Sequence, residues 1–239
     1  MKRISVILAA GMILLSFACN NKKEDKTEDK TQEKMVEETP AIAPVTAFEP
    51  FKVVAVQHKV AKFDAWRTAY NAHDSMQHAY GLTPYGLGRG LEDSNMVYAV
   101  LKMDDVQKAK EFSKLPNLKE VMKKAGVTGP PVFHYINVIR DDNSKIDYSD
   151  RVMVMHKVKD FDAWLKVYDG EGMEARKANG LLDRGLGRDV DDPNMVYIVF
   201  AITDMTKAKA RMNSPELKKL MTDAGVEGKP TFNFFRIVN

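Results

Sequence analysis

Apolar residues recur along the chain with two periods, one of two residues and one of three to four. Residues 51–60 are rich in valine and alternate with polar positions, which predicts a β-strand. Residues 61–80 place Phe63, Trp66 and Tyr70 at helical spacing, which predicts an amphipathic helix. The chain after its first 50 residues therefore begins as a strand followed by a helix.

The same two patterns continue to residue 139. Gly81 is placed to end the first helix, and Asp105 is a good N-cap for a second helical region that ends at Gly126. The order strand, helix, strand, strand, helix, strand is that of the ferredoxin-like βαββαβ unit. The further predicted strands are residues 83–90, 96–103 and 132–139.

This whole arrangement occurs twice in the sequence. The motif Phe-Asp-Ala-Trp at residues 63–66 returns at residues 161–164, and Gly-Leu-Gly-Arg at residues 86–89 returns at residues 185–188. A period of roughly 98 residues is too long for a solenoid repeat and fits a small domain. We therefore predict two homologous modules in one chain.

Both faces of the predicted sheet carry apolar side chains. Val54 and Val56 lie on one face, and Val53 and Ala55 on the other. Because an apolar face must be covered, helices are expected on one side and the sheet of the other module on the second side. The prediction is an α+β chain in which module 1 (residues 51–140) and module 2 (residues 149–239) pack sheet to sheet.

The paired motifs His-Lys-Val, Phe-Asp-Ala-Trp, Gly-Leu-Gly-Arg and Ala-Gly-Val resemble those of small proteins of the dimeric α/β-barrel superfamily, which includes antibiotic-biosynthesis monooxygenase-like domains. The resemblance covers residues 51–239. Since most members are homodimers of one module, it implies that this chain is a fused pseudo-dimer, for which a monomer is sufficient. The superfamily spans oxygenases, haem-handling enzymes, isomerases and binding domains, so the resemblance assigns no activity.

The first 50 residues have a different pattern. Lys2 and Arg3 precede an apolar run of signal-peptide length that is too short to span a membrane. The run ends in Leu-Leu-Ser-Phe-Ala-Cys, which resembles a bacterial lipoprotein signal with Cys19 as the lipidated (palmitate-bearing) residue. The prediction is a signal peptide over residues 1–18 and, over residues 19–50, a lipidated and disordered tether.

The residues after Cys19 indicate where such a lipoprotein goes. The position following Cys19 is not aspartate, which resembles outer-membrane sorting. Lys-Lys-Glu-Asp at residues 22–25 resembles the surface-export signal of Bacteroidetes lipoproteins, although a solvated tether has the same composition. We expect a protein anchored in the outer membrane and facing either the periplasm or the cell exterior.

Composition narrows the function classes. The chain is 44% apolar and 29% charged with a net charge of +3, which does not favour a nucleic-acid partner. One cysteine and five histidines exclude a disulfide framework and a thiolate-bound cluster. Neither histidines nor carboxylates show metal-ligand spacing, so no metal and no cofactor are expected.

The strongest candidates for chemistry are His58 and His156, which continue rows of valines in equivalent strands. Each is either a hydrogen-bonded core residue or a pocket residue that acts on a ligand, for example as a general base. Trp66, Tyr70, Trp164 and Tyr168 repeat on the first helix of each module, as core or as an aromatic wall.

Two further repeated pairs could contact a ligand. Arg89 and Arg188 end the Gly-Leu-Gly-Arg strand, where they could clamp a carboxylate or phenolate or form ion pairs with the nearby Asp93 and Asp192. The preceding glycines lack the helix that a nucleotide loop requires, so they indicate close backbone approach or a bulge. Tyr98 and Tyr197 could donate hydroxyls into the same space as the histidines.

Three functions follow from these residues. The first is binding of a small apolar or aromatic ligand in pockets between helices and sheet. The second is cofactor-free monooxygenase-like catalysis with His58 or His156 as the base. The third is a structural or interaction lipoprotein in which both histidines are core residues, and a filled interior beside them would favour it.

Overall fold

A computed structural model describes residues 48–72 and 74–238. The predicted signal peptide, Cys19 and most of the predicted tether lie outside these described residues. Within them, every helix is too short or too polar to span a bilayer. Residues 48–50 are exposed and lead into the first strand.

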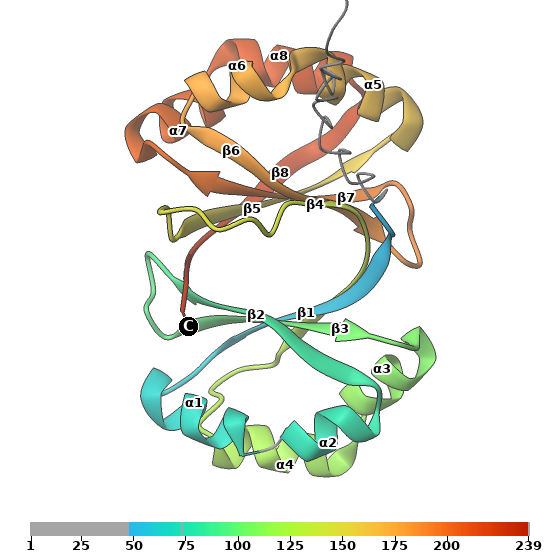
Figure 1. The fold of residues 1–239 in the computed structure, drawn as a ribbon, viewed down its shortest axis with the longest axis vertical. Helices are drawn as coiled ribbons and strands as arrows, with labels where there is room; N and C mark the ends of the chain where they lie inside the picture. Colours follow the sequence, from blue (N-terminus) through green and yellow to red (C-terminus); the bar gives the residue numbers. More distant parts are fainter. Residues whose placement is uncertain (1–47, 73, 239) are drawn as a thin grey trace, which may run out of the picture. The chain divides into compact units, whose positions relative to one another are not determined.

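Each module has four strands and four helices in the same order (Figure 1). In module 1 these are β1 (Phe51–Lys59), α1 (Phe63–Asn71), α2 (Asp74–Ala79), β2 (Leu82–Gly90), β3 (Met96–Met103), α3 (Val106–Ser113), α4 (Pro116–Lys124) and β4 (Val132–Asp141). In module 2 they are β5 (Asp150–Val158), α5 (Phe161–Glu171), α6 (Met173–Ala178), β6 (Leu181–Asp189), β7 (Met195–Ile202), α7 (Met205–Met212), α8 (Pro215–Asp223) and β8 (Val226–Ile237).

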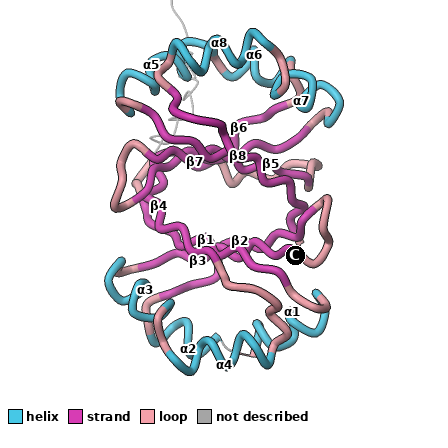
Figure 2. Tube along the Cα trace, turned by 180° about the vertical axis from the view of Figure 1, so that it is seen from behind, coloured by secondary structure: helices cyan, strands magenta, loops and turns pink. Residues whose placement is uncertain are grey.

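The eight strands form one closed antiparallel barrel in the order β1-β3-β2-β8-β5-β7-β6-β4. Each module contributes four adjacent strands in the ferredoxin-like order, and β2–β8 and β4–β6 pairs join the two modules. The two half-barrels lie in the middle and the helices of each module cover its outer side (Figure 2). The predicted fold class, a ferredoxin-like pseudo-dimer closed within one chain, is confirmed.

The two faces of each sheet have separate cores, as the alternation of apolar residues predicts. Val54 packs with the helices of module 1, and Val152 with those of module 2. Val53 and Ala55 instead belong to a cluster inside the barrel that also contains Met153 of module 2. Successive residues on one strand therefore belong to different hydrophobic cores, one beneath the helices and one inside the barrel.

The helix expected over residues 61–80 is interrupted in both modules. In module 2 the interruption falls at Gly172, whose φ of 79° lies in a region that glycine adopts without the penalty of a side chain. In module 1, α1 ends with Ala72 as its C-cap and α2 starts at Asp74. The predicted cap at Asp105 is confirmed, because its side chain accepts a hydrogen bond from the Lys108 amide.

The glycines of the Gly-Leu-Gly-Arg motifs lie where the two modules meet. A β-bulge precedes the motif in both β2 and β6, as register shifts show. A Cβ atom on Gly187 would lie 2.6 Å from Cγ2 of Ile136 and 2.8 Å from the Asn137 carbonyl oxygen. A Cβ atom on Gly88 would overlap the ring of Phe235. The interpretation as close-approach and bulge residues is confirmed.

Candidate functional site

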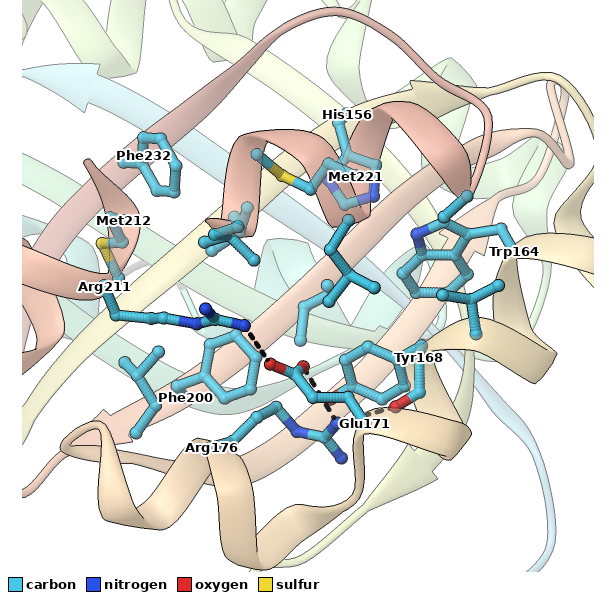
Figure 3. A pocket seen from close by; sticks show the side chains of 17 residues that line it. His156, Trp164, Tyr168, Glu171, Arg176, Phe200, Arg211, Met212, Met221 and Phe232 are labelled. Atoms are coloured by element: carbon cyan, nitrogen blue, oxygen red, sulfur yellow. Dashed lines mark hydrogen bonds and ion pairs between the residues drawn. The ribbon is translucent and has the colours of Figure 1, made fainter. Parts of the chain in front are cut away.

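Each module contains a small apolar pocket between its sheet and its helices. The pocket of module 2 has a volume of about 90 Å³ and that of module 1 about 80 Å³. Figure 3 shows the module 2 pocket, with His156 and Trp164 near one end and Arg176 and Arg211 near the other. Both pockets contain the histidine, tryptophan and tyrosine that the repeat predicted: His58, Trp66 and Tyr70, and His156, Trp164 and Tyr168.

The two histidines are placed by strand register. His58 pairs with Val97 across β1 and β3, and His156 pairs with Val196 across β5 and β7, so both side chains are directed to the helix layer. Their exposed fractions are 4% and 5%. Neither Nδ1 nor Nε2 of either ring has a hydrogen-bond partner among the described residues. The hydrogen bonds that a purely structural histidine would form are absent from the described structure.

Burial sets the protonation of both rings. It lowers the pKa of His58 and the pKa of His156 from 6.5 to about 4. Both imidazoles are therefore neutral at pH 7, and each presents one N–H donor and one nitrogen acceptor to its pocket. A general base works best with a pKa near the operating pH, so a pKa of about 4 suits ligand recognition better than proton abstraction.

These pKa values predict a loss of stability in mild acid. The unfolded chain binds protons on these imidazoles below pH 6.5, whereas the folded chain does so only near pH 4, so stability falls as pH decreases through this range. We expect each histidine to lower the free energy of unfolding by about 2 kcal/mol between pH 8 and pH 5. Urea unfolding at both pH values measures this loss.

The matched variants for that measurement are His58→Leu and His156→Leu, each of which should remove its own share of the pH dependence. His78→Leu is the control, because His78 is exposed on α2 and pairs with Asp74 at the surface. An unchanged pH profile in the two pocket variants would contradict the burial argument.

The aromatic residues form a stacked row beside each histidine. Trp66 stacks on Tyr70 with ring centroids 4.9 Å apart, and Trp164 stacks on Tyr168 at 5.1 Å. The histidine rings lie 5.2 Å from Trp66 and 5.4 Å from Trp164. Burial, the largest influence, raises the pKa of both tyrosines, so their hydroxyls are protonated at neutral pH. The rings supply a flat wall.

The far end of the pocket differs between the modules. In module 2, Arg176 donates to both carboxylate oxygens of Asp183 at 2.8 and 2.7 Å and to the Tyr168 carbonyl at 2.7 Å. Glu171 accepts from Arg211 at 2.6 Å (Figure 3). This end of the module 2 pocket is therefore charged but internally neutralised.

In module 1 none of the described residues that line the corresponding pocket is charged. Gln77 stands at the repeat position of Arg176, and Phe112 at that of Arg211. Gln77 is buried, and its Oε1 atom has no hydrogen-bond partner in the described part of the chain. The two pockets thus share the histidine end and have diverged at the other.

The arginines of the Gly-Leu-Gly-Arg motifs lie outside both pockets. The guanidinium of Arg89 packs over the Phe63 ring and that of Arg188 over the Phe161 ring, each 4.6 Å from the ring centroid. Arg89 also donates to the Ser94 carbonyl. Each arginine thus forms a cation–π contact with an adjacent aromatic residue, and its role as a ligand clamp stays a prediction.

The default ion pairs expected for these arginines are also wrong. Asp93 pairs with Lys59 at 2.7 Å, and Asp192 pairs with Lys157 at 2.7 Å. The lysines are closer because β1 and β5 bring their ends next to the turns that carry the aspartates. The arginines are thereby left to stack on phenylalanine.

Tyr98 and Tyr197 do not share space with the histidines. Both side chains belong to the cluster inside the barrel, on the sheet face opposite the helix layer. Tyr98 pairs across β1–β3 with Gln57. Gln57 precedes His58 in the strand, so the side chains of Gln57 and Tyr98 point to the sheet face opposite that of His58. The Tyr197 hydroxyl donates to Asp189 at 3.3 Å.

Several polar residues near cavities were missed by the sequence analysis. Arg176 and Arg184 are buried, and Arg151 is partly buried. Each differs from the residue at the equivalent position of the other module, so the internal repeat gives no signal for it. Across residues 48–72 and 74–238, no group of three histidine, cysteine or acidic side chains is arranged to hold a metal ion.

No protein-family model matches this chain, and no curated protein matches its sequence. Solved structures match its fold. A proposed monooxygenase from Fusobacterium nucleatum subsp. nucleatum is 14% identical, with 80% of this chain and 93% of that chain covered and a TM-score of 0.52. An anthrone oxidase-like protein is 13% identical, with coverage of 79% and 92% and a TM-score of 0.52.

A proposed chlorite dismutase is a third match, 11% identical, with 80% of this chain and 96% of that chain covered and a TM-score of 0.50. The structural matches show a shared fold. Because the sequence identities are this low, the matches assign no activity to this chain. The protein is therefore structurally similar to the ferredoxin-like proteins of the dimeric α/β-barrel class, with both halves of the barrel in one chain.

Proposed function

We propose that this protein binds a small apolar molecule with one polar edge in each of its two helix–sheet pockets. The observation that carries the proposal is the pair of buried imidazoles, both with unpartnered nitrogens, at the end of an apolar pocket in both modules. Burying an unpaired polar group costs free energy, and a ligand that hydrogen-bonds to it recovers that cost. A phenol meets this requirement.

The pocket volumes limit the size of the ligand. An apolar cavity of about 150 Å³ in another protein binds benzene, whereas these pockets measure about 90 and 80 Å³. One ring is thus the largest body that fits with modest side-chain movement. Met212 and Met221 line the module 2 pocket and Met76 and Met122 the module 1 pocket, and methionine adapts readily to a guest.

The two tryptophans make a direct test possible. They are the only two in the sequence, and each lies in one pocket, so fluorescence quenching reports on a known site. A Trp66→Phe variant reports on module 2 alone, and a Trp164→Phe variant on module 1 alone. Titration of both with phenol and toluene measures binding in each pocket separately. Absence of saturable quenching by both compounds would refute the proposal.

The histidine contribution is the second expected result. His156→Leu should weaken phenol binding in module 2 by about three- to tenfold, the value of one hydrogen bond, and leave toluene binding within about twofold. The same change at His58 should act only on module 1. Equal losses for phenol and toluene would show that the imidazole acts through packing alone.

The two other functions considered from the sequence have weaker support. Pockets beside both histidines do not match the filled interior expected of a purely structural protein. A catalytic base is less well supported than a binding residue, because the pKa of each histidine is lowered to about 4. Turnover of an activated phenol that is lost in His58→Leu and His156→Leu would favour the enzyme.

We further propose that Cys19 carries a lipid that anchors the protein in the outer membrane. The support is the sequence pattern: an apolar run, Leu-Leu-Ser-Phe-Ala-Cys, and no aspartate after the cysteine. Labelling of bacteria with radioactive palmitate should mark the wild-type chain and not Cys19→Ala, which should leave the membrane fraction. Membrane retention of the unlabelled variant would contradict the anchor.

A further inference from the structure

The largest of the cavities described lies inside the barrel, not beneath the helices. Its volume is about 640 Å³, and all eight strands contribute to its wall. The strands that line it form the closed barrel that Figures 1 and 2 show between the two layers of helices. Most of the wall is aliphatic or aromatic, with Val53, Val100, Met153, Val199 and Phe235 among its residues. Its volume is within the usual range of ligand cavities.

Two glycines of the cavity wall leave space that a side chain would fill. Gly86 pairs with Val100 across β2–β3, and Gly185 pairs with Val199 across β6–β7, so their missing side chains would point into the barrel. A Cβ atom would lie 4.0 Å from Val100 Cβ at Gly86 and 3.7 Å from Val199 Cβ at Gly185, which is ordinary contact. A larger residue at position 86 or 185 would therefore cause no clash at its Cβ atom, and its side chain would fill part of the cavity.

Two arginines stand at the wall of this cavity. Arg184 is buried, and it pairs with Asp142 at 2.9 Å and donates to the Ser144 carbonyl at 2.6 Å. Arg151 is partly buried, and its Nη1 donates to the Tyr148 and Asp150 carbonyls at 2.6 and 3.0 Å. No carboxylate among the described residues forms an ion pair with Arg151.

The two acids of the cavity wall do not neutralise Arg151. Asp142 is occupied by Arg184, and Asp141 accepts the Tyr85 hydroxyl at 2.5 Å. Burial and, secondly, the charge of Arg184 lower the pKa of Arg151, whereas the charge of the neighbouring Asp150 raises it; the arginine stays charged at neutral pH. Asp150 is itself paired with Arg236 at 2.6 Å, so the cavity joins an apolar interior to a guanidinium that forms no ion pair among the described residues.

We propose that the barrel interior is a separate binding site for an aliphatic carboxylate, such as a medium-chain fatty acid. The hydrocarbon chain occupies the apolar interior, and the carboxylate binds the guanidinium of Arg151. Guanidinium is the cation that matches a carboxylate in shape as well as charge, through two parallel hydrogen bonds. The site is independent of the helix–sheet pockets, because it lies on the other face of both sheets.

Calorimetric titration of the full-length Cys19→Ala chain tests the charge requirement. Decanoate should bind, decanol should bind more weakly, and decyltrimethylammonium should not bind. Arg151→Gln should weaken decanoate binding by about tenfold or more and leave decanol within about twofold. Arg140→Gln is the matched control, because Arg140 pairs with Asp169 at the surface and should have no effect. Equal binding of the cationic and anionic compounds would overturn the proposal.

A second measurement locates the ligand and separates this site from the pockets beneath the helices. Methionine methyl NMR should show a decanoate-dependent shift of Met153 and none of Met221, which lines the module 2 pocket. Gly86→Leu should abolish decanoate binding while phenol still quenches Trp164. His156→Leu should leave decanoate binding unchanged. Decanoate shifts confined to Met221, or decanoate binding retained in Gly86→Leu, would place the ligand elsewhere.

Discussion

Arg176→Met should destabilise the protein by about 3–5 kcal/mol, the largest single effect expected in this molecule. The Arg176 side chain is 5% exposed and makes bidentate hydrogen bonds to Asp183. Its removal leaves the Tyr168 carbonyl without this donor and the Asp183 carboxylate, which is 24% exposed, with only the Tyr168 hydroxyl at 3.3 Å. Methionine supplies no replacement. Removing one partner of a partly buried charge pair costs more free energy than the intact pair contributes.

The measurement is thermal and urea unfolding of Arg176→Met beside Gln77→Met. For a chain of this size the melting temperature of Arg176→Met should fall by about 10 °C or more. Gln77 occupies the equivalent position, and its Oε1 is already unpartnered in the described structure. Its replacement by methionine removes a hydrogen bond between neutral groups, to Tyr70, and should therefore cost only about 1 kcal/mol. Similar losses for both variants would show that packing volume, not charge, controls this position.

Gly187→Ala should destabilise the protein by about 3 kcal/mol, through the β4–β6 seam that joins the modules. The new Cβ would lie 2.6 Å from Ile136 Cγ2 and 2.8 Å from the Asn137 carbonyl oxygen. The methyl group of Ile136 can rotate away, but the carbonyl belongs to the paired strand and cannot move without disturbing the ladder. One methyl group is therefore expected to strain the closure of the barrel.

Gly185→Ala is the matched control, two residues away on the same strand. Its Cβ would meet Val199 Cβ at 3.7 Å, an ordinary contact, so its melting temperature should stay within about 2 °C of wild type. Gly187→Ala should melt about 6–12 °C lower. If the two variants unfold at the same temperature, the close approach across the seam has no energetic consequence.

The fold could be predicted from the sequence because its information is local and repeated. Alternation in residues 51–60, the apolar stripe of Phe63, Trp66 and Tyr70, and Asp105 as a cap each depend on near neighbours. The second copy then supplied the cover for the open sheet face, and strand parity placed His58 against the helices.

The remaining features depend on contacts that sequence spacing does not contain. Arg89 lies four residues before Asp93 in the sequence, yet Asp93 forms its ion pair with Lys59, which lies on the neighbouring strand. Tyr98 shares a repeat with the histidines but faces the opposite side of its strand. Arg151 and Arg184 lie in the sheet of module 2, but the barrel cavity that they line also needs the β2–β8 and β4–β6 pairs, which bring the strands of module 1 opposite them.

The closure of both half-barrels within one chain has a genetic consequence. In a homodimer every substitution enters both subunits at once, so the two sites remain identical by symmetry. Here the two halves are different segments of one chain, so they differ in sequence but are always made in equal amounts and always adjacent. Mutation can therefore change one site while the other is preserved, as the replacement of a glutamine at position 77 by an arginine at position 176 illustrates. Each half of the barrel can thus acquire its own chemistry while the two halves stay in one molecule.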